Sequence, residues 1–455
     1  GALASSVLSK GLSLTPIECW AGRGGLGSKL LQQHNIVAIV YGGDYHNDAH
    51  LHDLKRINDI FVKTTGKQMI PAVIDATTKY RYDPALQSGG TFGSNVTKLK
   101  DWLLFLNWSS IYLDNNTRLE IYNRLVKEHY LKQFNEEIVK PRSFKSCGEP
   151  CPALCKKVYQ KYKKDYEPYE ALGPNCGIFD QRAAEKINHF IDEQGFDAIQ
   201  AGNLISWVME FIHNRMIPKE EFGLTLEPKW DLSNFDVVND SMHNANVAVE
   251  IANMVLSPRG AIFRNGIRRA AKELDNKYNK GTIHKALFTP HGKTGDIGAN
   301  QYWVPGFFIS MPIQGKYFED YEADFKEPYD LGVKSADRMV KELYSDNTGM
   351  CRFHRKWIEK VVPTLVNELF DQNIDYYKHH KRLAHEIDKV HDKSVFWESE
   401  RVIDVVKIYL EKLYGGDPNN QALANWVNKF RGDKWQAARE YWEQVSKGII
   451  DGLKV

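Results

Sequence analysis

The residues best suited to chemistry in this sequence are its cysteines, three of which fall close together. The stretch SCGEPCPALCKK places Cys147, Cys151 and Cys155 at a C-x3-C-x3-C spacing. The other cysteines of the chain are Cys19, Cys176 and Cys351. In a chain of 455 residues with no recognisable export signal, clustered cysteines favour a metal site over disulfides.

The spacing of the cysteines leaves several kinds of site open. Structural zinc uses C-x2-4-C pairs together with a second, distant pair. A cubane iron–sulfur cluster needs four thiolates, often three close together and one remote, and Cys351 is the remote candidate. A radical-enzyme cluster would need C-x3-C-x2-C, which this spacing misses by one residue. Three thiols without a metal are the simplest alternative, but Pro150 and Pro152 interrupt helix and favour a loop that wraps a cluster.

Two acidic motifs share one design. DEQGFD runs from Asp192 to Asp197 and DNTGMC from Asp346 to Cys351, and both read D-x-x-G-x-[CD]. We expect Gly195 and Gly349 each to end a helix with a positive φ. A carboxylate before such a turn and a polar group after it can accept hydrogen bonds from the N–H groups of a planar heterocycle.

A glycine-rich loop near the start of the chain suggests an anion site. AGRGGLGSK (residues 21–29) has the glycine spacing of a P-loop, but Ser28 and Lys29 stand in the wrong order. Consecutive glycines let backbone N–H groups point into one concavity, and Arg23 adds positive charge. The loop precedes the expected strand NIVAIVYGG (residues 35–43), which argues against both P-loop and Rossmann geometry.

The composition is that of an ordinary globular protein. Hydrophobic residues make up 42% and charged residues 26%, and the formal net charge of +2 does not indicate nucleic-acid binding. The length predicts roughly two to four domains. We see neither a run of apolar residues long enough for a membrane helix nor a signal peptide, so we expect a cytoplasmic protein.

Local patterns predict mainly helices. We expect one helix from Asp180, a capping residue, to Gly195, and a second, buried helix in NLISWVMEFIHNR. A turn is expected in QSGGTFGSN (residues 87–95), irregular structure over about 276–345, and amphipathic helices after Cys351.

These motifs together resemble the tungsten-dependent aldehyde:ferredoxin oxidoreductase family. The resemblance is carried by AGRGGLGSK, CGEPCPALC, YEPYEALGPN, DEQGFDAIQAGN and DNTGMCRFHR, and it spans nearly the whole chain. CGEPCP, PIQGKY and KYRYDP followed by SGGTFG look most like the glyceraldehyde-3-phosphate:ferredoxin oxidoreductase branch. The family's opening C-x2-C is C-x3-C here, as in the CGEPC branch.

The resemblance implies an α+β fold that surrounds a buried metal–pterin and a cluster. We expect the C-terminal part of a β-rich pterin domain at 1–43, a mainly helical domain with the three cysteines at 44–275, and a second at 276–455. Family members carry a substantial β-rich segment before the position of Gly1. We therefore expect a separate chain to provide this segment, or the sequence to be a fragment.

The resemblance also implies the site residues. It predicts a tungsten or molybdenum bis-pterin, a [4Fe–4S] cluster ligated by Cys147, Cys151, Cys155 and Cys351, and Mg²⁺ bridging the pterin phosphates. The residues expected to contact the pterins or their phosphates are Arg23, Gly24, Gly25, Gly27, Asp192, Phe196, Asp197, Asp346, Met350 and Cys351.

The catalytic carboxylate of the family falls in DYEPYEALGPN, where we favour Glu167, with Asp165 and Glu170 behind it. Beside a dry metal pocket such a group can move protons, although a solvated acidic loop is the plainer interpretation. Other members carry a second acid, a histidine upstream of the last cysteine. His291 and Tyr302 are the substitutes here.

The leading interpretation is oxidation of an aldehyde, such as glyceraldehyde-3-phosphate, to its acid with electrons passed to ferredoxin. One alternative is a low-potential reductase of the class II benzoyl-CoA reductase type, in which Cys176 would be a tungsten ligand. Another is a non-catalytic iron–sulfur electron-transfer subunit. A run of lysines and arginines around the cysteines, either solvated surface or a docking patch for ferredoxin, comprises Lys140, Arg142, Lys145, Lys156, Lys157, Lys161, Lys163 and Lys164.

Overall fold

The computed structural model describes residues 26–40, 53–76, 82–141, 157–159, 162–303, 324–390 and 395–455. Helices account for most of these residues, and the strands that they contain pair as two short antiparallel hairpins. β1 (Lys157–Tyr159) pairs with β2 (Tyr162–Lys164), and β3 (Phe288–His291) pairs with β4 (Gly295–Gly298). A mostly helical chain with few strands confirms the α+β class that the sequence predicts.

The largest hydrophobic core, called the large core below, lies among residues 92–288. Its helices are α4 (Gly90–Leu99), α5 (Asn115–Ile121), α6 (Lys132–Phe134), α7 (Tyr166–Ala171), α8 (Gln181–Glu193), α9 (Ala198–His213), α10 (Asn239–Leu256) and α11 (Ile267–Tyr278). α8 begins where the sequence predicts, because the Asp180 carboxylate accepts a hydrogen bond from the N–H of Arg182 at 2.9 Å. α9 is the expected buried helix.

α4 replaces the turn that we expected in QSGGTFGSN. Gly90 begins the helix with a φ of +70°, and the glycines serve close packing. A Cβ atom on Gly93 would lie 2.0 Å from the Oγ of Ser88. The residues after α5 continue as two π-helical stretches, η6 (Tyr122–Leu131) and η7 (Asn135–Val139). This geometry is rare in proteins and is frequently found at functional sites.

The C-terminal core joins the last helices of the chain and is closed by Trp108 and Trp303. Its helices are α12 (Pro328–Asn347), α14 (Tyr376–Val390), α15 (Glu400–Gly416), α16 (Gln421–Gly432) and α17 (Lys434–Leu453). α12 and α17 pack backbone to backbone, because a Cβ on Gly332 would lie 2.1 Å from the carbonyl oxygen of Val445. Amphipathic helices after Cys351 are thus confirmed, whereas α12 is a regular helix inside a region expected to be irregular.

A small core joins α2 (Leu54–Thr65) and α3 (Met69–Ala76) to α13 (Arg355–Leu369). The rings of Phe61 and Trp357 lie 5.3 Å apart, and Lys63 forms an ion pair with Glu368 at 2.7 Å. Two helices from the start of the chain, α2 and α3, therefore pack on α13. Phe288 lies beyond the boundary expected at residue 275 but belongs to the large core. The domain division at residues 43 and 275 stays a prediction.

Short 3₁₀ helices complete the described chain: η4 (Lys100–Trp102), η5 (Ser109–Tyr112), η8 (Pro174–Cys176), η9 (Lys219–Phe222), η10 (Pro258–Asn265), η11 (Thr282–Lys285) and η13 (Arg352–His354). None of the described helices combines the length and apolar composition that a bilayer crossing requires.

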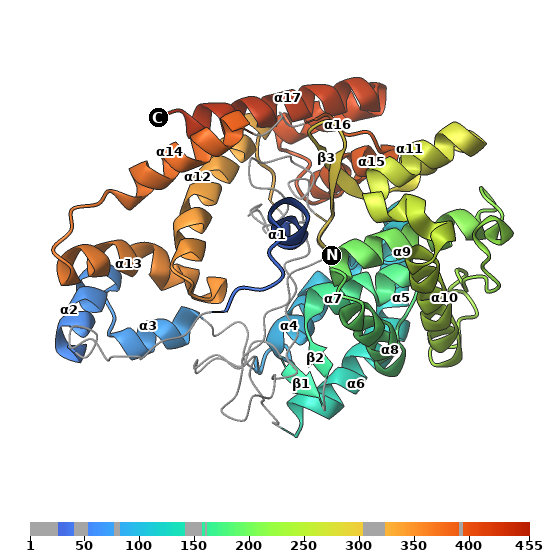
Figure 1. Cartoon of the computed structure of the whole chain (residues 1–455), viewed down its shortest axis with the longest axis horizontal. Helices are drawn as coiled ribbons and strands as arrows, with labels where there is room; N and C mark the ends of the chain where they lie inside the picture. Colours follow the sequence, from blue (N-terminus) through green and yellow to red (C-terminus); the bar gives the residue numbers. More distant parts are fainter. Residues whose placement is uncertain are drawn as a thin grey trace.

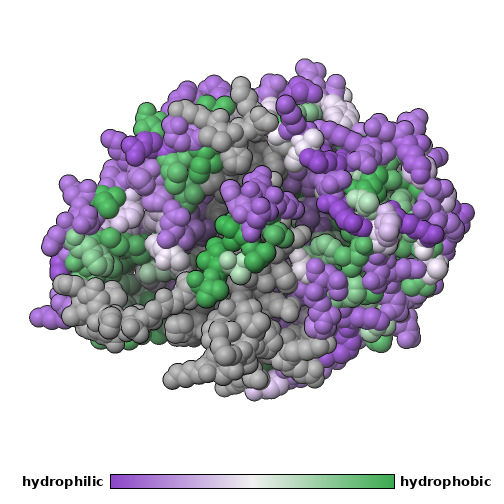
Figure 2. Space-filling model, viewed as in Figure 1, coloured by the Kyte–Doolittle hydropathy of each residue, from purple (hydrophilic) through white to green (hydrophobic). Residues whose placement is uncertain are grey.

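The residues after α1 (Leu26–His34) do not form the strand that the sequence predicts. In the described part of that segment, residues 35–40, no strand partner is present, so the β-branched run has no ladder to join. Val37 is 83% exposed and Val40 94% exposed. Figure 2 shows a group of apolar side chains near the middle of the viewed face, where α1 and the residues after it lie in Figure 1. In Figure 1, α1 lies between α12 on one side and α7 to α9 on the other.

Candidate active site

The two acidic motifs end their helices with the same backbone geometry. Gly195 follows α8 with a φ of +70°, and its N–H donates to the carbonyl of Asp192 at 3.0 Å. Gly349 follows α12 with the same φ, and its N–H donates to the carbonyl of Asp346 at 3.0 Å. Glycine adopts this left-handed conformation without steric cost. The expectation that both glycines end helices is confirmed.

The residues after each turn differ in what they already bind. The Asp197 carboxylate caps α9 by accepting a hydrogen bond from the N–H of Gln200 at 2.8 Å, and Phe196 packs against the large core. Met350 is exposed, and the half-buried Cys351 precedes η13. α8 and α12 lie on opposite sides of α1 in the view of Figure 1. Contact of these residues with pterins stays a prediction.

The acidic segment forms α7, and its three carboxylates have different environments. Asp165 caps the helix by accepting from the N–H of Tyr166 at 2.9 Å, and it also accepts from the Thr91 hydroxyl at 2.5 Å. Because these bonds fix its carboxylate, Asp165 is poorly placed to exchange protons. Glu167 lies in the first turn of α7 and is partly exposed. Among the described residues it is the acid of α7 that is best placed to reach a substrate and solvent.

Glu170 lies one helical turn after Glu167 and is fully buried. Neither of its carboxylate oxygens has a hydrogen-bond partner in the described part of the chain. Burial raises the pKa of Glu170 well above its ordinary value, because the charged form loses its hydration. Burial therefore favours the uncharged carboxylic acid form of this group.

A buried polar network holds α7 against α9 and the segment after β4. The Tyr166 hydroxyl donates to the carbonyl of Gln301 at 2.6 Å. The Gln301 side chain donates to Asn203 at 3.1 Å and accepts from the Trp108 indole at 3.2 Å. The ring of Tyr302 lies 5.2 Å from that of Tyr166. Sequence reasoning missed Gln301 and Asn203, because single amides in unremarkable surroundings give no local signal.

The hairpin that carries His291 is anchored from outside. Arg268 donates to the carbonyls of Gly292 and Gly295 at 3.1 and 3.0 Å, and it forms an ion pair with Glu398 at 2.7 Å. These bonds fix the backbone around the tip of the hairpin. The side chain of His291 lies outside what the structure describes, so its catalytic role stays a prediction.

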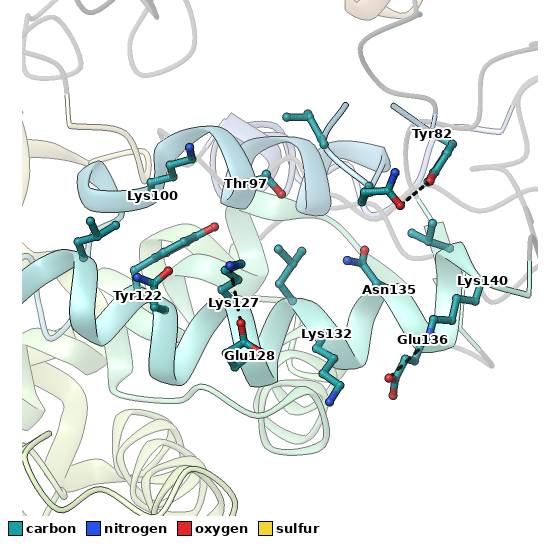
Figure 3. Close-up of a pocket in the computed structure, with 16 residues that line it drawn as sticks. Tyr82, Thr97, Lys100, Tyr122, Lys127, Glu128, Lys132, Asn135, Glu136 and Lys140 are labelled. Atoms are coloured by element: carbon teal, nitrogen blue, oxygen red, sulfur yellow. Dashed lines mark hydrogen bonds and ion pairs between the residues drawn. The ribbon is translucent and has the colours of Figure 1, made fainter. Parts of the chain in front are cut away.

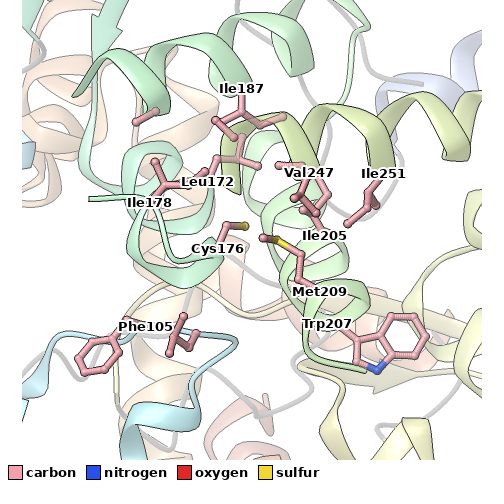
Figure 4. Packing of buried hydrophobic residues seen from close by; sticks show 14 of the residues in the cluster. Phe105, Leu172, Cys176, Ile178, Ile187, Ile205, Trp207, Met209, Val247 and Ile251 are labelled. Atoms are coloured by element: carbon pink, nitrogen blue, oxygen red, sulfur yellow. The ribbon is translucent and has the colours of Figure 1, made fainter. Parts of the chain in front are cut away.

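Cys176 lies in the large core, where its thiol points among apolar side chains such as Met209 and Ile205 (Figure 4). Its Sγ donates to the carbonyl of Ala171 at 3.3 Å. Burial raises the pKa of this thiol well above its ordinary value. A metal ligand must be a thiolate, so this environment does not favour Cys176 as a tungsten ligand.

The remaining expected ligands fall largely outside the described residues. This holds for Cys147, Cys151 and Cys155 and for Arg23, Gly24 and Gly25, while Gly27 lies in α1. Among the described residues, no group of three or more His, Cys, Asp or Glu side chains is placed to hold a metal ion. Two features of the described chain fit a bound polar heterocycle with its metal. One is the pair of matched turns that follow acidic residues, and the other is the carboxyl of Glu170, which has no hydrogen-bond partner among the described residues.

The expected basic patch does not include Lys164, because this residue is buried. Its side chain is 0% exposed, and it binds the carboxylate of Glu185 and, at 2.8 Å, the side-chain oxygen of Gln181. Burial lowers its pKa to about 8, against the opposing effect of Glu185. Lys164 therefore ties β2 to α8 and is not available to a partner, whereas Lys140 is exposed.

Comparison with known families identifies the class of protein. Residues 76–374, well over half of the chain, match the family described as "Aldehyde ferredoxin oxidoreductase, domains 2 & 3". The chain belongs to this family, and the resemblance seen in its motifs is confirmed.

Named relatives narrow the class further. The chain is similar to the glyceraldehyde-3-phosphate:ferredoxin oxidoreductase of Pyrococcus furiosus, with 35% identity over 98% of this chain and 70% of the relative. An uncharacterized protein of Methanocaldococcus jannaschii is 36% identical over 94% of this chain and 70% of its own length. A tungsten-containing aldehyde ferredoxin oxidoreductase of Pyrococcus horikoshii is 26% identical over 49% of this chain and 34% of its own. The chain is thus an oxidoreductase of the aldehyde:ferredoxin type.

Proposed function

We propose that the protein oxidises an aldehyde to the carboxylic acid and passes the electrons to ferredoxin. The observation that carries the proposal is the pair of matched helix-ending turns, the second of which leads into Cys351. The relatives described above support it, since one is named a glyceraldehyde-3-phosphate:ferredoxin oxidoreductase and another a tungsten-containing aldehyde ferredoxin oxidoreductase. The reaction converts an aldehyde and water into an acid, two electrons and two protons.

The implied groups are a tungsten or molybdenum bis-pterin and a [4Fe–4S] cluster. When bound, they accept the two electrons and pass them on singly. The residues of this chain position them and move protons. Asp192 and Asp346 stand before the two turns and would face the pterins, Cys351 would complete the cluster thiolates, and Glu167 would take a proton from water.

The first named relative suggests glyceraldehyde-3-phosphate as the substrate. Identity of 35% over nearly the whole chain makes a phosphorylated aldehyde the first compound to test. In the described structure, Cys176 is a neutral core thiol and does not support the benzoyl-CoA reductase alternative. Aldehyde turnover would distinguish the proposed enzyme from a non-catalytic iron–sulfur electron-transfer subunit.

A groove beside the cysteine segment fits an acidic electron carrier. It has a volume of about 1080 Å³ and lies between α4 and the π-helical stretches η6 and η7 (Figure 3). Its lining includes Lys100, Lys127, Lys132 and Lys140 but only two acidic residues, Glu128 and Glu136. Lys100 and Lys132 have no ion-pair partner in the described part of the chain, so their charge is free for an acidic surface.

The chain itself limits how far this groove lies from the cluster segment. The chain from Lys140 to Cys147 is short, so even fully extended it would span at most about 25 Å. Cys147 therefore lies within about 25 Å of Lys140, which lines the groove. We place ferredoxin docking at this groove. Complementary charge there would mainly raise the encounter rate, and salt would screen it over about 8 Å at physiological ionic strength.

The test of the proposed function is aldehyde oxidation by the holoenzyme under anaerobic conditions. Glyceraldehyde-3-phosphate should be oxidised with ferredoxin as acceptor, and glyceraldehyde without the phosphate serves as the matched control. Equal turnover of both aldehydes would leave the activity standing and exclude a phosphate-specific site. Absence of turnover with any aldehyde by a metal-loaded enzyme would overturn the proposal.

A further inference from the structure

Cys351 stands in a short link between two helices that contact each other, α12 and α13 (Figure 1). α12 ends at Asn347, η13 begins directly after Cys351, and α13 begins at Arg355. The cysteine is half-buried, and its carbonyl accepts a hydrogen bond from the N–H of His354 at 2.9 Å. Because the link is short, the place of the thiol depends on how the two helices are held together.

A network of charged side chains joins the helices on either side of this link. Glu342 of α12 is 0% exposed, and one of its carboxylate oxygens lies 3.1 Å from the guanidinium of Arg338 and 3.5 Å from that of Arg355. Arg338 also binds the carboxylate of Glu359 in α13. Two of these ion pairs cross from α12 to α13, and the pair within α12 joins them into one network.

Stability alone does not explain why Glu342 is buried among arginines. Removing a carboxylate from water costs free energy, and apolar side chains of similar volume often stabilise a fold as well as a buried ion pair or better. Geometry is the better explanation. A buried carboxylate that must meet two guanidinium groups, one from each helix, restricts how α12 and α13 can lie against each other.

A third helix, α14, holds the start of the same link. The side-chain amide of Asn347, the last residue of α12, contacts Nε2 of His380 at 3.2 Å. Nδ1 of His380 donates to the carbonyl of Tyr376 at 2.8 Å, so Nε2 is the acceptor of the Asn347 amide. Burial lowers the pKa of His380, which favours this uncharged ring. The link to Cys351 is therefore fixed at more points than a helix-ending turn at Gly349 requires.

We propose that Glu342 is a positioning residue for the iron–sulfur cluster. By binding Arg338 and Arg355 it sets the place of Cys351 between α12 and α13. Its negative charge also offsets that of Arg355, which follows Cys351 by four residues. The net charge around a cluster is one of the factors that set its reduction potential. The inference rests on the proposed function, because it needs Cys351 as a ligand of the cluster.

The test is Glu342→Gln in the holoenzyme purified without oxygen. Glutamine keeps the size of the side chain but has no charge with which to hold the two arginines. The variant should lose iron to the chelator bipyridine about 10–100-fold faster than the wild type, the range typical of residues that support metal ligands. The midpoint potential of the cluster, followed by electron paramagnetic resonance during a redox titration, should rise, because loss of a negative charge favours the reduced cluster.

Glu210→Gln is the matched control, because Glu210 is another buried glutamate bound by an arginine, Arg401, and neither residue belongs to the helices beside Cys351. It should lower the melting temperature but leave iron loss and the midpoint potential as in the wild type. Arg355→Met is a second variant in case Glu342→Gln does not fold, since the Arg355 side chain is 22% exposed. It should also speed iron loss, but it should lower the potential, because it removes a positive charge.

The outcomes separate this inference from the proposed function. Wild-type iron loss and potential in both variants overturn the positioning role, and so does a Glu210→Gln control that changes both quantities equally. Either result leaves aldehyde oxidation by the wild type intact. A wild-type protein that holds the cluster but oxidises no aldehyde refutes the proposed function, while the shifts in the variants still support the role of Glu342. A reconstituted protein without any cluster signal overturns both.

Discussion

Replacing Arg401 with methionine should destabilise the protein by about 3 kcal/mol, because it strands a buried carboxylate. Arg401 of α15 and Glu210 of α9 are both buried, and their side chains join through two bonds of 2.7 and 3.0 Å. The pair connects the C-terminal core with the large core. Burial alone would raise the pKa of Glu210, yet Arg401 holds that pKa below its ordinary value.

The size of the expected destabilisation depends on the hydrogen-bond partners that Glu210 keeps when Arg401 is replaced. Removing one member of a buried ion pair commonly costs about 3–5 kcal/mol. Glu210 would still accept from the Asn107 amide at 2.5 Å and from Lys285 at 3.2 Å, which places the cost near the lower limit. Arg431→Met is the matched control. Arg431 is 55% exposed and pairs with Glu411 at 3.0 Å, so its loss should cost less than about 1 kcal/mol.

Urea denaturation followed by tryptophan fluorescence measures these differences, provided that the unfolding transition remains single. A double-mutant cycle with Glu210→Gln isolates the interaction, and the double variant should lose less than the sum of the two single variants. The pKa of Glu210 is lowered by folding, so its contribution is present above the unfolded pKa of about 4.3 and is lost as pH falls through the folded value. Additive losses, or an Arg401→Met variant as stable as the control, would refute this reasoning.

Three further predictions concern the candidate site. Cys351→Ser should lower the iron content and disturb the pterin, and full iron with normal activity would rule it out as a cluster ligand. Glu167→Gln should keep metal and iron but lose about 10²–10⁴-fold in turnover, so unchanged turnover at saturating aldehyde would exclude it as the base. Replacing Lys100 and Lys132 with glutamine should slow ferredoxin reduction at low salt but not reduction of a small uncharged dye. Equal ferredoxin rates in variant and wild type would show that the groove is only solvated surface.

Short-range signals predicted the parts of this structure that depend on local physics. Asp180 marked the start of α8 because its carboxylate bonds to the first free N–H groups, and Gly195 and Gly349 marked helix ends because they take a positive φ. The glycines of residues 87–95 misled the same reasoning, since Gly93 serves close packing against Ser88.

Contacts between distant parts of the chain could not be predicted in this way. The burial of Glu170 depends on several helices that pack around α7, and that of Lys164 on a carboxylate in α8. Gln301 and Asn203 meet only because α9 packs against the segment after β4. The sequence therefore indicated which acids lie in α7, but not which of them is buried without a partner among the described residues.

The most direct test of the account is a metal analysis of the holoprotein purified without oxygen. An aldehyde oxidoreductase of this family should contain tungsten or molybdenum together with about four iron atoms per cluster. Tungsten or molybdenum alongside iron is the result that the account predicts. Iron without either metal would contradict the proposed activity and favour an electron-transfer subunit, and a fully folded protein that binds none of these metals when reconstituted would contradict the account altogether.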